Sequence, residues 1–236
     1  MKKISLSIKL LAGITVLLFL VTSAQAVTVV LTPEKDCYMH GVQYTWFWRW
    51  WWQSGNDNKL KVGRWYTSLY ELEDRILIYF NLSSIPKNAK IESAELRLYY
   101  TCGSNDQNDK YQICRLTEDW NEYYLNRSWI YSRNRPLHVC SGIKSSVPSS
   151  SGWMTWNITN DVKGFVNGSY KNYGWVVKFY SSDGWSYFKS REASNNQPQL
   201  IIRYTIPQTS VPELTPVGLV LLVGGLIALS IRKFLK

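Results

Sequence analysis

The chain has 236 residues, of which 15% are aromatic and 19% are charged, and its formal net charge at pH 7 is +10. This length permits one large domain or two small ones. The positive charge is mild once the basic ends are set aside, and no run of five basic residues occurs. The charge therefore favours an acidic polymer or an anionic surface as partner and does not support nucleic-acid binding.

The first 26 residues have the organisation of a secretory signal. Three lysines precede an apolar run at residues 10–21, and Ala24-Gln25-Ala26 provides a small-x-small cleavage site. The alternative is an N-terminal membrane anchor, but the apolar run is short for a membrane span. We expect the mature chain to begin at Val27, which opens a β-branched strand predicted over residues 27–31.

A tryptophan-rich segment follows, with five of the 12 tryptophans between residues 46 and 52. Because side chains alternate along a strand, an extended conformation would place four rings on one face: Trp46, Trp48, Trp50 and Trp52. Indole rings stack on the flat C–H faces of sugars, and Arg49 is suited to an acidic sugar, so the segment is a candidate carbohydrate platform. The alternative is that these rings belong to the core or to a contact with a partner.

Two strands predicted in the middle of the chain organise the rest. Residues 76–80 carry apolar side chains on both faces, which is typical of a strand covered on each side, and Pro86 ends this stretch. Residues 91–100 alternate strictly between apolar and polar positions, which predicts a half-buried antiparallel strand. The inward positions of that strand are Ala94, Leu96, Leu98 and Tyr100.

Further short strands are predicted around residues 111–116, 153–158, 174–179, 187–190 and 199–204. Residues 160–167 form the one predicted helix, which Thr159 or Asn160 can cap and Gly168 ends. This pattern favours an all-β fold, an antiparallel sandwich of the jelly-roll type with one short helix. Trp185 and Tyr187 are a second candidate aromatic site, although ordinary strand packing is the simpler interpretation.

The four cysteines lie behind an expected secretion signal, so two disulfides are expected, and all three pairings stay open: Cys37, Cys102, Cys114 and Cys140. Their spacing does not fit a zinc site. A structural calcium site is conceivable if loops bring three carboxylates together: Asp36, Asp57 and Asp183. Of the four Asn-x-Ser/Thr sequons, at 81, 126, 157 and 167, we expect glycosylation first at Asn126 or Asn167.

Signals for catalysis are weak. His40 and His138 are the only histidines, and neither lies in a recognisable nucleophile or metal motif. Five acidic residues are formal candidates for a carboxylate pair in glycoside hydrolysis: Glu118, Asp119, Glu122, Asp161 and Glu192. Ion pairing, such as that of Glu192 with Arg191, is the expected role of these groups.

Nine short motifs follow one another in an order that resembles the DNRLRE domain of disaggregatase-related surface proteins. These motifs are Leu60–Gly63, Arg75–Pro86, Glu92–Leu98, Leu116–Glu122, Trp156–Thr159, Gly164–Gly168, Asn172–Gly174, Phe188–Glu192 and Pro198–Leu200. The resemblance covers roughly residues 30–205 and implies a jelly-roll module that is similar to carbohydrate-binding modules. Asn81 and Asn157 stand where that family tends to have Asp.

The C-terminal end predicts attachment to a membrane. A Pro-containing stretch at residues 212–216 leads into an uncharged apolar run at 217–231 and a basic tail at 232–236. This end resembles the PEF-CTERM-type sorting signals of archaeal surface proteins. We expect a signal at 1–26, a domain at 27–206, a linker at 207–216 and an anchor that leaves the domain outside the cell.

The predicted function is non-catalytic binding of an acidic polysaccharide at the cell surface. Two alternatives belong to other classes. The first is a structural or adhesive envelope protein whose tryptophan-rich segment contacts a protein partner. The second is a polysaccharide-degrading enzyme.

Overall fold

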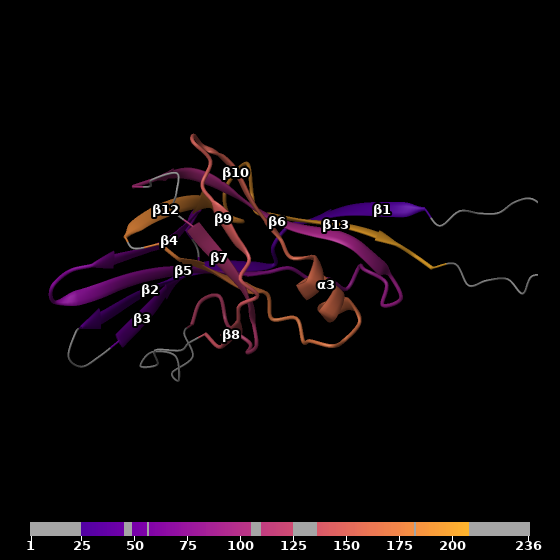
Figure 1. Ribbon diagram of the computed structural model, residues 1–236, viewed down its shortest axis with the longest axis horizontal. Coiled ribbons are helices and arrows are strands. Elements are labelled where there is room, and N and C mark those ends of the chain that lie inside the picture. The colour runs from indigo at the N-terminus through magenta and orange to yellow at the C-terminus, as the bar shows by residue number, and fades with distance from the viewer. Residues whose placement is uncertain are drawn as a thin grey trace, which may run out of the picture. The chain divides into compact units, whose positions relative to one another are not determined.

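The computed structural model describes residues 25–44, 49–55, 57–104, 110–124, 136–181 and 183–207, which form antiparallel strands and one α-helix (Figure 1). The strands are β1 Ala26–Leu31, β2 Lys35–Tyr44, β3 Arg49–Ser54, β4 Lys59–Tyr66, β5 Tyr70–Tyr79, β6 Lys90–Gly103, β7 Lys110–Leu116, β8 His138–Val139, β9 Lys144–Ser146, β10 Gly152–Asn157, β11 Trp175–Phe179, β12 Gly184–Lys189 and β13 Gln199–Thr205, and the helix is α3 Thr159–Val166. The prediction of an all-β fold with one short helix is confirmed.

The strands form two layers that share one hydrogen-bonded network. One layer contains β3, β2, β5, β11 and β7, with β8 and β9 at its edge. The other contains β1, β13, β6, β12 and β4, with β10 on the opposite edge of β6. The layers join because β5 changes neighbours, pairing with β4 through residues 71–74 and with β11 through residues 75–78. Figure 1 shows β2, β3, β4 and β5 running together, away from α3 and the β1–β13 pair.

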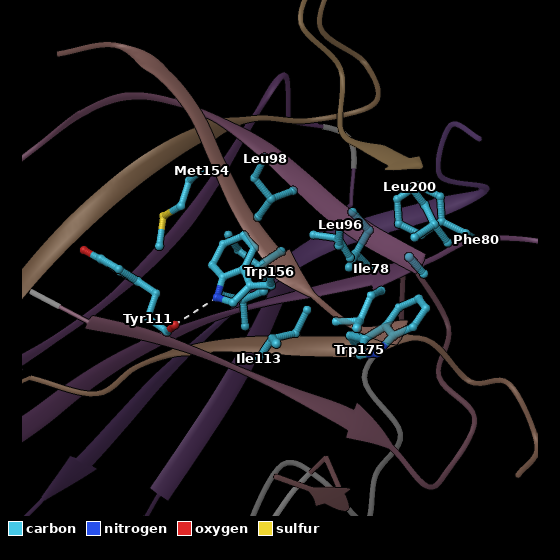
Figure 2. Close-up of a cluster of buried hydrophobic side chains, with 14 of the residues drawn as sticks. Ile78, Phe80, Leu96, Leu98, Tyr111, Ile113, Met154, Trp156, Trp175 and Leu200 are labelled. Carbon is cyan, nitrogen blue, oxygen red and sulfur yellow. Dashed lines mark hydrogen bonds between the residues drawn. The ribbon is translucent and has the colours of Figure 1, made fainter. Parts of the chain in front are cut away.

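The main core lies between these layers and takes its residues from both of them (Figure 2). The indole of Trp156 on β10 donates a 2.9 Å hydrogen bond to the backbone carbonyl of Tyr111 on β7. The hydroxyl of Tyr111 in turn lies 2.6 Å from that of Ser186 on β12. The predicted inward positions of the two central strands are buried, which confirms both patterns.

The helix begins differently from the prediction. Neither Thr159 nor Asn160 caps it, because the N-cap is Ile158, and the side-chain oxygen of Asn157 accepts the hydrogen of the Thr159 amide at 3.1 Å. The Thr159 hydroxyl instead accepts a 2.9 Å hydrogen bond from the amide of Ala94 on β6, which fixes the helix to the sheet. The helix ends as predicted, with Gly168 in the left-handed conformation at φ +79°.

One disulfide joins Cys114 to Cys140, so the expectation of two disulfides is corrected. Cys37 is buried beneath the side of β2 and β5 that faces away from the main core, whereas Cys102 is exposed on the outer side of β6. These two thiols are free, since they lie on different layers.

Residues 1–24 and 208–236 lie outside the described part of the chain, so the signal segment and the C-terminal anchor remain predictions. Among the described residues, no helix has the length and apolar character that crossing a membrane requires.

Candidate functional site

A row of side chains crosses five neighbouring strands on one face of the protein. Directly paired residues of an antiparallel sheet point to the same side. The register pairs Trp52 with His40, His40 with Asp74, Asp74 with Gly63, and Gly63 with Trp185. This row therefore runs from β3 through β2, β5 and β4 to β12. We call the surface around it the open face.

Gly63 allows the strands in the middle of this row to approach closely. A Cβ atom at Gly63 would lie 2.5 Å from the Gly184 carbonyl oxygen and 2.8 Å from the Cβ of Trp185. Such contacts are too short for any side chain, so glycine is required here. The Cα and Cβ atoms of Trp185 consequently lie close to the backbone of β4 at Gly63.

A hollow of about 290 Å³ lies at the β12 end of the open face. Its lining combines aromatic, apolar and charged side chains: Lys61, Arg64, Trp65, Tyr70, Leu72, Asp74, Gly184 and Trp185. Half of the Trp65 surface is exposed. Trp185 packs edge to face against Tyr187, with ring centroids 5.2 Å apart. The hollow is at the small end of ligand sites and can hold one sugar ring between aromatic walls.

Asp74 organises the charges of the open face. Its carboxylate accepts a hydrogen bond from the Lys61 ammonium at 2.9 Å and is also bonded to the Nδ1 atom of His40. Only 5% of the Asp74 side chain is exposed, against 26% for Lys61. Burial alone would lower the pKa of Lys61, but the hydrogen bond and charge of Asp74 outweigh it and the pKa is raised. Lys61 therefore stays a fixed cation beside the hollow.

The structure places some of the predicted platform residues on the open face. Trp52 is 51% exposed and its ring lies 4.2 Å from that of His40, between centroids. Trp185 and Tyr187 also lie on the outer side of β12, where both are half-buried and their rings pack against each other. Trp46 and Trp48 lie outside the described residues, as do the side chains of two β3 residues, Arg49 and Trp50.

The fifth ring of the segment, Trp51, is part of the core. It lies over Gly41, where a Cβ atom would meet the indole at 2.7 Å. The Arg75 guanidinium packs on this ring, 4.8 Å from its centroid. Arg75 and Glu73 are both buried, and the Nε atom of Arg75 lies 2.8 Å from the Oε1 atom of Glu73. We call this side of β2, β3 and β5, which packs on Trp120 and Leu116, the closed face.

Lys61, Asp74 and Trp65 are not among the predicted site residues, because their common location depends on the pairing of β4 with β5. One signal was available in β4. Leu60 and Val62 point into the core, so the alternate positions of that strand, including Lys61 and Trp65, had to face outward.

The three carboxylates proposed for calcium do not gather in the structure. Asp36 instead lies with Glu122 and Glu192, whose carboxylate oxygens are within 4.8 Å of its own. Arg191 already provides a cation here, with Nε 2.9 Å from both glutamates. Calcium requires six or more oxygen ligands, and a guanidinium within the cluster does not fit that requirement.

This cluster fastens three segments of the fold. The Asp36 amide donates to Glu122, and the Arg191 amide donates to Asp36 at 2.8 Å. Burial raises the pKa of Asp36 to about 8, although the hydrogen bond from Arg191 opposes this shift. The predicted ion pair of Glu192 with Arg191 is confirmed.

A second set of potential metal ligands consists of His138 with Cys114 and Cys140. The two sulfur atoms form the disulfide, so they are not thiolates and do not ligate. His138 accepts a hydrogen bond from Lys178 at Nε2, 3.0 Å away, with Nδ1 directed at the Pro136 carbonyl. Burial lowers the pKa of His138.

Asn167 is exposed after α3, and its side-chain oxygen accepts the amide hydrogen of Ser169 at 2.9 Å. Asn126 lies outside the described residues. Glycosylation at either position remains a prediction.

Comparison with known families identifies the class of the domain. No curated protein matches the sequence. A family model, described as carbohydrate-binding module family 96, matches residues 28–204, from the first described strand to the last. The chain belongs to this family of carbohydrate-binding modules.

Proposed function

We propose that the domain binds an acidic polysaccharide on the open face and does not cleave it. The observation that carries this proposal is the hollow, in which Trp65 and Trp185 lie beside the charged ammonium of Lys61. Indole rings stack on the C–H faces of sugars, and a fixed cation attracts a carboxylate or sulfate on the same sugar. The half-exposed ring of Trp52 extends the aromatic surface beyond the hollow.

The proposal is tested by titrating the full chain with acidic and neutral polysaccharides. We expect saturable binding to an acidic polymer and at least about a tenfold loss of affinity in Trp185→Ala, because stacking and apolar burial are lost together. The matched control is Tyr124→Ala, since Tyr124 is 75% exposed and lies outside the open face. Unchanged binding in a folded Trp185→Ala protein would overturn the proposal.

Binding without cleavage agrees with the positions of the carboxylates. Both oxygens of Asp74, which borders the hollow, are held by His40 and Lys61. Asp36 and Glu122 are buried with Arg191 and are not exposed to a polymer. Incubation with the bound polysaccharide should release no oligosaccharides. Oligosaccharide release that stays with the protein through purification would favour the polysaccharide-degrading enzyme instead.

A structural or adhesive envelope protein is the second candidate. Exposed apolar side chains gather around the turn between β4 and β5 and at the end of β2: Tyr44, Trp65, Tyr66 and Leu69. Such an exposed apolar patch can also form an interface with a protein partner. A defined oligomer of the full chain that forms without glycan would favour this candidate.

For the rest of the chain we propose the arrangement that its sequence suggests. Residues 1–26 would direct export, 207–216 would act as a linker, and 217–231 would anchor the module at the outer face of the membrane. The strand connections would be those of a jelly roll. Detection of the domain on intact cells by an external protease would support this arrangement, and protection from the protease would contradict it.

A further inference from the structure

A second aromatic pair lies on the outer surface of the layer that carries Trp185. Tyr99 on β6 pairs directly with Trp153 on β10, and their rings meet edge to face with centroids 5.3 Å apart. The flanking residues Leu98 and Met154 point into the core, so the two rings face outward. Both are partly exposed.

Two lysines separate this pair from the open face. Lys59 on β4 and Lys189 on β12 are directly opposite each other in the register. Like charges at directly opposed positions destabilise a sheet. In the described part of the chain no carboxylate forms an ion pair with either of them. Among the described residues, the two lysines therefore form a local excess of positive charge.

The lysines connect the two aromatic pairs into one track. Trp185, Tyr187 and Lys189 follow each other at alternate positions on the outer side of β12, over roughly 13 Å. The Lys59 ammonium lies 5.9 Å from the centre of the Tyr187 ring. Because Phe188 pairs with Tyr100, Lys189 lies next to Tyr99. The surface is continuous from the hollow to Trp153.

We propose that Tyr99, Trp153, Lys59 and Lys189 form a second subsite for an anionic sugar unit of the same polysaccharide chain. This inference rests on the proposed function of the open face. The polymer would lie along β12, with one sugar ring in the hollow and another against the Tyr99–Trp153 pair. An anionic group between Lys59 and Lys189 would neutralise their repulsion. The module would therefore recognise the interior of an acidic chain and bind longer fragments more tightly than short ones.

The test compares short and long oligosaccharides of one acidic polymer, with uronate and sulfated series tried separately to identify the anionic group. Full-chain variants Trp153→Ala, Lys189→Gln and Lys59→Gln are titrated beside Lys163→Gln, an exposed control on α3. We expect Trp153→Ala to lower the affinity for long fragments about three- to tenfold, and Lys189→Gln or Lys59→Gln to lower it about two- to fivefold. The affinity for short fragments should not change. The lysine changes should also reduce the salt dependence of binding.

The outcomes separate this inference from the proposed function. If Trp185→Ala abolishes binding while the Trp153 and lysine variants bind long fragments normally, the second subsite is rejected and the open face stands. If Trp185→Ala binds both lengths normally, the proposed function fails. Equal losses for short and long fragments in Trp153→Ala would also reject the two-subsite arrangement. The glutamine variants should fold at least as stably as the native protein, so their result does not depend on a damaged core.

Discussion

Trp51 and Trp52 are neighbours in the chain, yet they belong to different faces of the same strands. Trp51 lies on the closed face, 3% exposed, between the bare backbone of Gly41 and the Arg75 guanidinium. Trp52 lies on the open face, 51% exposed, with the His40 ring against its own. One tryptophan-rich segment therefore supplies a core residue and a surface for ligands. Their difference in environment leads to separable predictions for stability and binding.

The largest expected effect is the loss of stability in Trp51→Ala. Removing a buried indole should lower the free energy of unfolding by about 3–5 kcal/mol, because a cavity opens under Arg75. Trp52→Ala is the matched control and should change it by less than about 1 kcal/mol while weakening polysaccharide binding. Urea denaturation of both variants measures the difference. Equal losses of stability would show that the two faces are not distinct.

Reduction of the Cys114–Cys140 disulfide should produce the next largest effect. The bond spans 26 residues and fastens the segment after β8 to β7, on the side of the closed face. Its loss should cost about 3 kcal/mol of stability through the entropy of the unfolded chain. Binding measured well below the melting temperature should persist, because the open face does not include this segment. Loss of binding in a folded, reduced protein would contradict the separation of the faces.

A change of pH should affect the buried cluster of Asp36 more than the open face. Burial raises the pKa of Asp36 from 3.8 to about 8, so the folded protein holds this proton over a range in which the unfolded chain releases it. The stability contribution is complete below pH 4 and is lost as the pH rises towards 8 and above. Asp36→Asn should therefore gain stability relative to the native protein between pH 5 and pH 9 in thermal unfolding. A difference that is constant with pH would contradict the raised pKa.

The sequence predicted the layers of the fold better than it predicted the site. Ile76, Ile78 and Phe80 carry a local pattern that only a buried strand satisfies, and the structure confirms it. The strand itself begins earlier, at Tyr70, because its polar first half pairs with β4. No local pattern marks residues 70–74 as a strand that joins two layers.

The site depends on register, which the sequence does not determine by itself. Gly41 looks like an ordinary loop glycine until β2 and β3 pair and bring Trp51 over it. Asp74 meets His40 and Lys61 only when three strands align. Equal spacing of the tryptophans indicated which rings share a face, and it did not indicate which face would be covered.

The smallest expected effect concerns the charge balance of the open face. Asp74→Asn removes the negative charge beside Lys61 and His40 but keeps a polar side chain of the same shape. The affinity for an acidic polysaccharide should rise about two- to fivefold at low salt and return to the native value at high salt, because salt screens the attraction between the partly exposed Lys61 ammonium and the polymer.

The pH dependence of this variant separates two roles of Asp74. Without the Asp74 carboxylate, the hydrogen bond and the charge that raise the pKa of Lys61 are lost, and burial lowers this pKa. Lys61 of the variant should therefore lose its proton at a lower pH than Lys61 of the native protein. The gain in affinity should disappear as the pH becomes alkaline. Titrations at pH 7 and pH 9, each at two salt concentrations, measure both effects. A weaker affinity for Asp74→Asn at every salt concentration would mean that the carboxylate matters more for positioning Lys61 than for neutralising it. The open face would then resemble the closed face, with its charged groups held in one geometry by their neighbours.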